Sequence, residues 1–154
     1  MTEGATRFGR GVARVLLPPY LLALMWVVCS PADQARHVTG FVGLLADGIA
    51  ALGFDAAAAF AVIEFAANIV MFVPFGLLLP LATPVGPGTA VIAAAGTSVV
   101  IELVQLVVPG RVSTGWDVLA NTAGAAVGAG IAALAMRAQV TGRNRESAPQ
   151  EVRG

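Results

Sequence analysis

Four long apolar runs follow one another along the chain, and each contains few charged residues. They cover about residues 12–29, 56–82, 89–108 and 117–136. Each is close to the roughly 20 residues that an α-helix needs to cross about 30 Å of hydrocarbon. The pattern therefore predicts an all-α polytopic membrane protein with four transmembrane helices.

The connection between the first two runs has a different pattern. Its apolar residues from Val38 to Leu52 recur at helical spacing, with Asp47 among them. This spacing is typical of an amphipathic helix that lies on a membrane surface. We expect an interfacial helix on the outer leaflet over residues 38–54, with a re-entrant segment as the alternative. The lone His37 in this connection is interpreted as a solvated side chain.

Composition agrees with the membrane class. Hydrophobic residues make up 57% of the 154 residues and charged residues 12%, with a mean hydropathy of +0.82. A soluble domain of this length is much less apolar. Cys29 is the single cysteine, which argues against a disulfide framework. The sequence contains no Gly-rich phosphate loop and no paired-His zinc motif, so we expect no cofactor, no metal site and no nucleic-acid partner.

The distribution of arginine predicts the orientation. Every basic residue is an arginine, and most of them lie near the two chain ends: Arg7, Arg10, Arg14, Arg137, Arg143, Arg145 and Arg153. Four spans place both termini on one side, and the positive-inside rule assigns that side to the cytoplasm. We therefore expect a multi-pass protein of the bacterial cytoplasmic membrane with both termini cytoplasmic.

The two ends of the chain predict whether the first run is cleaved and where the membrane domain ends. The first run is expected to be an uncleaved anchor, because "WVVCSPAD" lacks a small-x-small cleavage site. Residues 1–136 are expected to form the membrane domain. Residues 137–154 are polar and are expected to form a disordered cytoplasmic tail.

Three of the four runs carry costly polar residues, spaced three or four positions apart within each run. Such spacing places each pair on one helix face. Counted from residue 56, Glu64 lies about 12 Å and Asn68 about 18 Å below the outer surface. Acidic residues inside a span cost about 2.5–3.5 kcal/mol, so these side chains are predicted to converge on one polar site in the outer half of the bundle. The pairs are Glu64 and Asn68, Glu102 and Gln105, and Asp117 and Asn121.

Arg111 lies in the turn after the third run and is the nearest cation in sequence. Its guanidinium is a candidate to neutralise Glu102 or Asp117, or to hold a carboxylate or phosphate of a ligand. The same two acids are candidates for a catalytic acid–base pair. Ser98 and Ser113 have no neighbouring histidine that would make either a nucleophile. Whether the protein is an enzyme is therefore left open.

Helix packing is predicted from small residues and proline. Gly124 and Gly128 continue the polar face of the fourth run and form a small-xxx-small match. Pro74 frees the carbonyl of Val70 and is expected to bend the second run.

Three sequence elements resemble the VanZ-like family of small bacterial membrane proteins. They are "NIVMFVPFGLLLP", "IELVQLVVPGR" and "DVLANTAGAAVG", and the resemblance is strongest over residues 64–136. Glu64 is not part of the family pattern. The residues that match it are Asn68, Phe72, Pro74, Gly76, Glu102, Gln105, Arg111, Asp117, Asn121, Gly124 and Gly128.

The resemblance implies a role in the cell envelope. The family's namesake is linked to low-level resistance to teicoplanin, which acts on cell-wall precursors outside the membrane. The first hypothesis is an outward-facing site that binds, or modifies, an envelope lipid or a cell-wall-linked amphiphile, with a role in resistance to envelope-targeting antibiotics as a further expectation. The second is a structural or partner-binding subunit whose polar cluster is a hydrogen-bond lock. The third is a small transporter that works as a homo-oligomer.

Overall fold

Four long helices make up the structure, and the described part of the chain contains no β-strand. The computed structural model describes residues 2–29, 40, 43–45, 47–107 and 115–146. Each long helix contains a segment that is long and apolar enough to cross a membrane, which confirms the predicted all-α, four-span architecture. The helices are α1 (Thr2–Cys29), α3 (Ala56–Ala82), α4 (Pro87–Gln105) and α5 (Gly115–Glu146).

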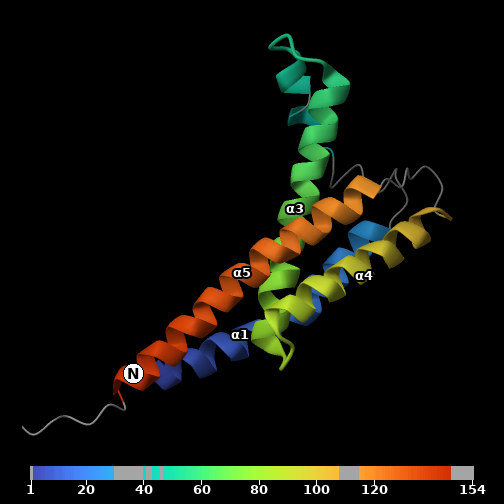
Figure 1. Ribbon diagram of the computed structural model, residues 1–154. Helices are drawn as coiled ribbons and strands as arrows, with labels where there is room; N and C mark the ends of the chain where they lie inside the picture. The colour runs from blue at the N-terminus through green and yellow to red at the C-terminus, as the bar shows by residue number, and fades with distance from the viewer. Residues whose placement is uncertain (1, 30–39, 41–42, 46, 108–114, 147–154) are drawn as a thin grey trace, which may run out of the picture.

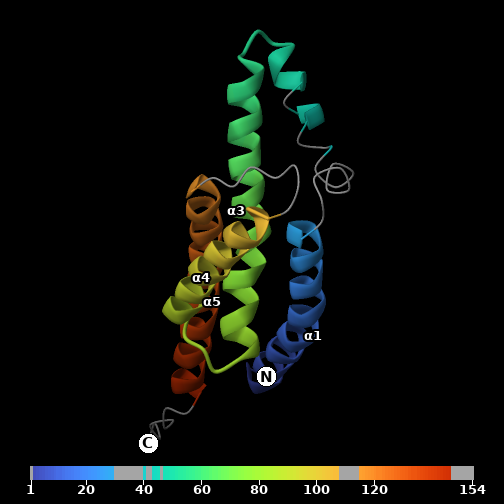
Figure 2. The same ribbon diagram turned by 90° about the vertical axis from the view of Figure 1, so that its right-hand side faces the viewer.

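The helices form a bundle around α3. This helix packs against the other three, and its most extensive interface is with α5 (Figure 1). The start of α1 and the end of α5 lie at the same end of the bundle (Figure 2). At the opposite end, the first turns of α3 project beyond the other three helices (Figure 2).

Two helix boundaries differ from those expected. Helix α1 starts at Thr2, well before the apolar run at residue 12. Helix α5 continues to Glu146, so residues 137–146 are helical, which corrects the prediction of a disordered tail for this part. Residues 147–154 lie outside the described residues. The segment "RAQVTGRNRE" is polar, but Ala, Arg and Gln are good helix formers, and it contains no proline.

Both ends of α3 are capped. The side chain of Asp55 accepts a hydrogen bond of 2.8 Å from the backbone N–H of Ala58 at the first turn. At the other end, Arg14 Nε of α1 donates to the carbonyl of Ala82 at 3.1 Å. A cation is favourable there because the last carbonyls of a helix lack partners and carry partial negative charge. Arg14 thus joins the end of α3 to α1.

The segment before α3 is helical over residues 43–45 and 47–50. A turn at Gly53, with φ of 91°, connects it to α3. Leu44, Leu52 and Phe54 are all strongly exposed. The described part does not include a continuous helix over residues 38–54, so the interfacial amphipathic helix stays a prediction.

Helices α3 and α5 touch through their backbones. A Cβ atom at Gly124 would overlap the carbonyl of Ile69, and one at Gly128 would overlap the carbonyl of Val73. Gly76 of α3 faces the backbone of α5 in the same way. Such close approach is how small residues join helices in lipid, where burying apolar area gives little advantage. The small-xxx-small match of Gly124 and Gly128 therefore acts as a helix-packing motif between α3 and α5.

A second contact lies beside the proline of α3. Pro74 has no N–H, so the carbonyl of Val70 lacks its usual helical donor. The next carbonyl, that of Met71, accepts a hydrogen bond of 2.9 Å from the Tyr20 hydroxyl of α1. The rings of Phe72 and Phe75 stack with centroids 5.8 Å apart, and Tyr20 packs against the core cluster that contains them. This part of α3 is therefore held against α1.

Replacing Gly124 with alanine tests the crossing. We expect a loss of about 1–3 kcal/mol in stability, because the new Cβ overlaps the backbone of Ile69 and forces the helices apart. The matched control is Gly130→Ala on the same helix, where a Cβ meets nothing within 4 Å. This control should be neutral or slightly stabilising, since alanine is the better helix former. Thermal unfolding in detergent measures both, and equal midpoints would contradict the backbone contact.

Candidate functional site

Polar side chains from three helices meet near the start of α5. Asn68 Nδ2 of α3 donates a hydrogen bond of 2.9 Å to Asp117 Oδ1 of α5. One helical turn further along α5, Asn121 Nδ2 donates to Ser98 Oγ of α4 at 2.7 Å. The structure therefore brings together three of the residues that were expected to converge, and each bond joins two helices.

Burial differs among the polar residues of α4 and α5 at this end of the bundle. Asn121 is 4% exposed and Gln105 is 8% exposed, while Ser98 is fully buried. The two acids, Glu102 and Asp117, are half-buried. A buried polar group that makes no hydrogen bond costs free energy, and the cost is larger where no water reaches it. The cross-helix bonds therefore stabilise side chains that would otherwise oppose insertion.

Ser98 is the member of the cluster that sequence reasoning missed. It was considered only as a nucleophile without a histidine, whereas in the structure its hydroxyl accepts a hydrogen bond from Asn121. The available signal was its position, four residues before Glu102 and seven before Gln105, which puts it on the same face of α4. The buried stripe of α4 contains Ala90, Ala94, Ser98, Ile101 and Gln105.

The structure does not place the other two expected site residues in the cluster. Glu64 is exposed on α3, one turn before Asn68 and toward the projecting end of the helix. Arg111 lies outside the described residues, so its position relative to the acids stays a prediction. No group of three His, Cys, Asp or Glu side chains in the described segments is arranged to hold a metal ion.

The hydrogen bond between Asn68 and Asp117 changes the estimate of depth. Asp117 lies in the first turn of α5, whereas counting from residue 56 placed Asn68 about 18 Å below the surface. Asp117 near the surface and Asn68 about 18 Å below it would be too far apart for this hydrogen bond. The count from residue 56 is the one that fails, because the start of α3 projects beyond α5 (Figure 2). Counted instead from Ala82 at the opposite end of α3, Asn68 lies about 21 Å up the helix. With Ala82 taken to lie at one surface of a 30 Å hydrocarbon core, this leaves about 9 Å to the other surface, so we expect a shallower cluster than the count from residue 56 gives.

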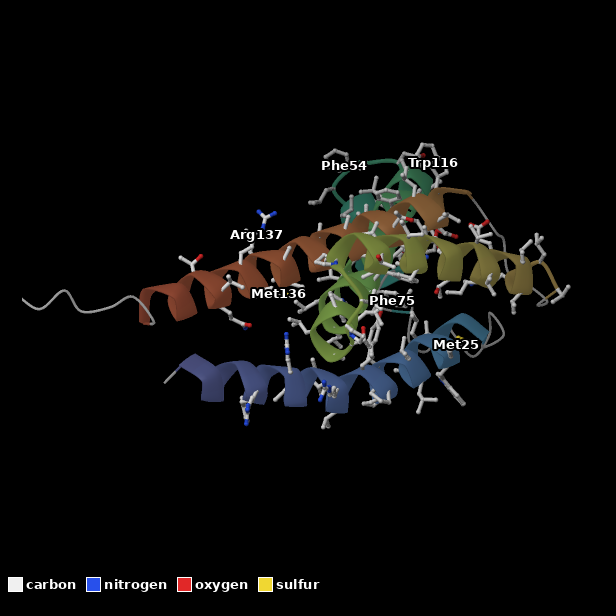
Figure 3. All side chains as sticks on the ribbon, turned by 60° about the horizontal axis from the view of Figure 1, so that its bottom comes forward. Met25, Phe54, Phe75, Trp116, Met136 and Arg137 are labelled. Atoms are coloured by element: carbon white, nitrogen blue, oxygen red, sulfur yellow. The ribbon has the colours of Figure 1, made fainter. Side chains whose placement is uncertain are left out.

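Tryptophans mark the end of the bundle that holds the cluster. Trp26 near the end of α1 and Trp116 at the start of α5 are each 68% exposed. Figure 3 shows Trp116 and Met25 at one end of the bundle and Arg137 toward the other. Tryptophan is enriched at membrane–water interfaces, so these side chains indicate where the bundle meets the head groups.

The family model for VanZ/LLP1 matches residues 19–136, which is more than half of the chain. The chain belongs to the VanZ-like family. No curated protein and no solved structure matches it. In this VanZ-like membrane protein, Asn68, Asp117 and Asn121 of the family pattern take part in the hydrogen bonds of the cluster. The glycines of the pattern form the α3–α5 crossing. The motif thus combines a packing surface with a polar site.

A double-mutant cycle tests the deeper bond. Ser98→Ala and Asn121→Ala should each destabilise the fold, and the double variant should lose less than their sum. The coupling expected for a hydrogen bond between membrane helices is about 0.5–1.5 kcal/mol. Thr122→Val is the matched control, because the Thr122 hydroxyl donates only to Val118 within α5, at 2.7 Å. Strictly additive losses for Ser98 and Asn121 would show that the contact contributes nothing.

Proposed function

We propose that this VanZ-like membrane protein binds an envelope lipid or a cell-wall-linked amphiphile at its polar cluster. The observation that carries the proposal is the convergence of polar side chains from α3, α4 and α5 near one end of the bundle. Ionisable and amide groups inside a membrane are costly, and they most often mark a binding site or pathway. At a depth of about 9 Å, the cluster is within reach of a head group.

The exposed arginines support an outward orientation of this site. Arg7, Arg10 and Arg137 are exposed on the parts of α1 and α5 that lie away from the cluster. The positive-inside rule assigns their end to the cytoplasm. The protein then lies in the bacterial cytoplasmic membrane with both termini inside, and its cluster faces the outer leaflet.

The roles of individual residues follow from their chemistry. Arg111 is proposed to hold the phosphate of the head group, because its planar guanidinium can donate two parallel hydrogen bonds. The amides of Asn68, Gln105 and Asn121 line the site beneath it. If the amphiphile is a cell-wall precursor, its sequestration would also reduce the action of antibiotics that bind such precursors.

A structural lock is the second candidate function. It is favoured by the observation that the amide N–H of each asparagine already bonds to a neighbouring helix. In that case the cluster fixes the helix arrangement, and the activity belongs to a membrane partner. The two functions differ in what the loss of Arg111 should do.

Topology can be tested with single cysteines in a Cys29→Ala background. A cysteine at Leu52, which is 76% exposed near the projecting end of α3, should react with a membrane-impermeant maleimide on intact cells. A cysteine at Gly86, which is exposed between α3 and α4, should react only after permeabilisation. Labelling of position 86 on intact cells would invert the topology and place the cluster on the cytoplasmic side.

Arg111→Gln separates the ligand site from the lock. For a ligand site, the variant should unfold at the wild-type temperature and lose at least about tenfold in lipid binding, since a charge-assisted contact is removed. Thermal unfolding and native mass spectrometry of retained lipids measure the two quantities. The control is Arg10→Gln, an exposed arginine at the far end of α1.

The lock gives the opposite result for the same variant. Arg111→Gln should then lower the unfolding temperature, and adding Glu102→Gln or Asp117→Asn should restore much of the loss. A stable Arg111→Gln protein with full lipid retention would contradict both roles of this arginine.

A further inference from the structure

Arg14 of α1 lies at the end of the bundle opposite to the polar cluster, beside the last turn of α3. Its Nε donates a hydrogen bond of 3.1 Å to the carbonyl of Ala82, the last residue of that helix. The guanidinium is therefore level with Ala82, which is taken to mark the surface of the hydrocarbon core. Lipid head groups occupy about the next 5–7 Å outward. Arg14 thus lies at the inner edge of the head-group layer.

The bond to Ala82 uses only part of the guanidinium. Within the described part of the chain, the two terminal nitrogens of Arg14 make no hydrogen bond, and the residue is exposed. The nearby carbonyl of Leu79 already accepts from the N–H of Thr83 at 3.1 Å and from its hydroxyl at 2.7 Å. The remaining N–H donors of a permanently charged group therefore face the surroundings of the bundle.

None of the carboxylates that the structure describes is near enough to neutralise Arg14. Asp117, for example, bonds to Asn68, which is about 21 Å along α3 from Ala82. On α1 itself, Glu3 is eleven residues from Arg14, about 16 Å along the helix. The described carboxylates all lie toward the cluster end of the bundle: Asp47, Asp55, Glu64, Glu102 and Asp117. The other described charges at the end that holds Arg14 are arginines: Arg7, Arg10 and Arg137. This end therefore favours an anionic partner from outside the described chain.

We propose that Arg14 binds the phosphate of an anionic phospholipid, such as phosphatidylglycerol, beside the end of α3. The phosphate accepts charge-assisted hydrogen bonds from the terminal nitrogens of Arg14, while Nε keeps its bond to Ala82. An anionic lipid is favoured over a zwitterionic one, because the ammonium of a zwitterionic head group cancels its charge and is repelled by the neighbouring arginines. This site is separate from the polar cluster and does not depend on the function proposed for it.

The surface of α1 next to Arg14 suits the acyl chains of the same lipid. From Arg14 toward the middle of the bundle, the exposed side chains of α1 include Val15, Leu16 and Leu22. A phospholipid whose phosphate is held at Arg14 has its acyl chains alongside these residues. The bound phosphate also holds the guanidinium in the position that caps α3. The lipid therefore strengthens the contact between α1 and α3.

Two lipids that differ in net charge test the proposal with the full-length protein in detergent. Phosphatidylglycerol is anionic at neutral pH, whereas phosphatidylcholine has the same phosphodiester, no net charge and no N–H donor. Native mass spectrometry measures the affinity, and the rise in unfolding temperature measures the stabilisation. We expect phosphatidylglycerol to bind at least about fivefold more tightly and to raise the unfolding temperature more. Equal effects of the two lipids would overturn the proposal.

Two matched variants assign the preference to Arg14. Arg14→Gln removes the charge, so the affinities for the two lipids should come within about twofold of each other. Arg10→Gln makes the same change on α1, one turn nearer the chain end, at an exposed residue that makes no hydrogen bond to the described chain. It should keep the wild-type preference, because salt screens an exposed charge that does not touch the lipid. Equal losses in both variants would show a diffuse attraction and overturn the Arg14 site.

Further arms identify the source of the phosphate and keep the test decisive. Inorganic phosphate at millimolar concentration should leave the unfolding temperature unchanged, because it has no acyl chains to lie along α1. A rise equal to that with phosphatidylglycerol would show a free-phosphate site and overturn the lipid. The wild-type comparison of the two lipids decides the matter if Arg14→Gln does not fold. The difference between the wild type and Arg14→Gln reports this site alone, so its absence would overturn the Arg14 site and leave the proposal for the polar cluster untouched.

Discussion

The backbone contact between α3 and α5 is the constraint on which the rest of the structure depends. The two helices run in the same direction, and Gly124 and Gly128 meet the carbonyls of Ile69 and Val73, each pair four residues apart. Because no side chains separate the helices, a slip by one turn would bring bulkier residues into the contact. The register fixed in this way puts Asn68 beside Asp117 and presents Asn121 to Ser98 on α4.

Hydrogen bonding in lipid explains why packing and polarity share one stripe of α5. Asp117 and Asn121 precede the glycines at spacings that keep them near the same face. A polar side chain that faces lipid finds no water to replace its lost bonds, so it must lie where other helices are close. The glycines create that closeness, and the polar residues then make the helix arrangement specific. Without the glycines, the polar side chains of α5 would lack close partners, and without the polar side chains the close contact would be less specific.

Spacing predicted the spans, the shared polar faces and the glycine contact, because each depends on local periodicity. The depth of Asn68 was not predictable in this way, since counting from residue 56 assumes that every helix begins at the membrane surface, and α3 projects beyond the others. Ser98 was missed because a small neutral hydroxyl costs little free energy in a membrane span, so it does not stand out in the sequence as the charged residues do. The length of α5 was missed because loss of hydropathy marks the end of a membrane span, which need not be the end of a helix.

The half of the bundle at the arginine-bearing end favours a binding site over a transport pathway. Next to the cluster, Phe72 is fully buried and belongs to the apolar core with Phe75 and Ile101. Toward the arginine-bearing end, the buried residues of α4 and α5 are small and apolar: Ala90, Ala94, Ala125, Ala129 and Ala132. An ion or polar solute that crosses a membrane needs hydrogen-bonding partners along its whole route. Within the described helices, buried polar side chains are confined to the cluster end, which is why we propose a binding site there and not a transport route.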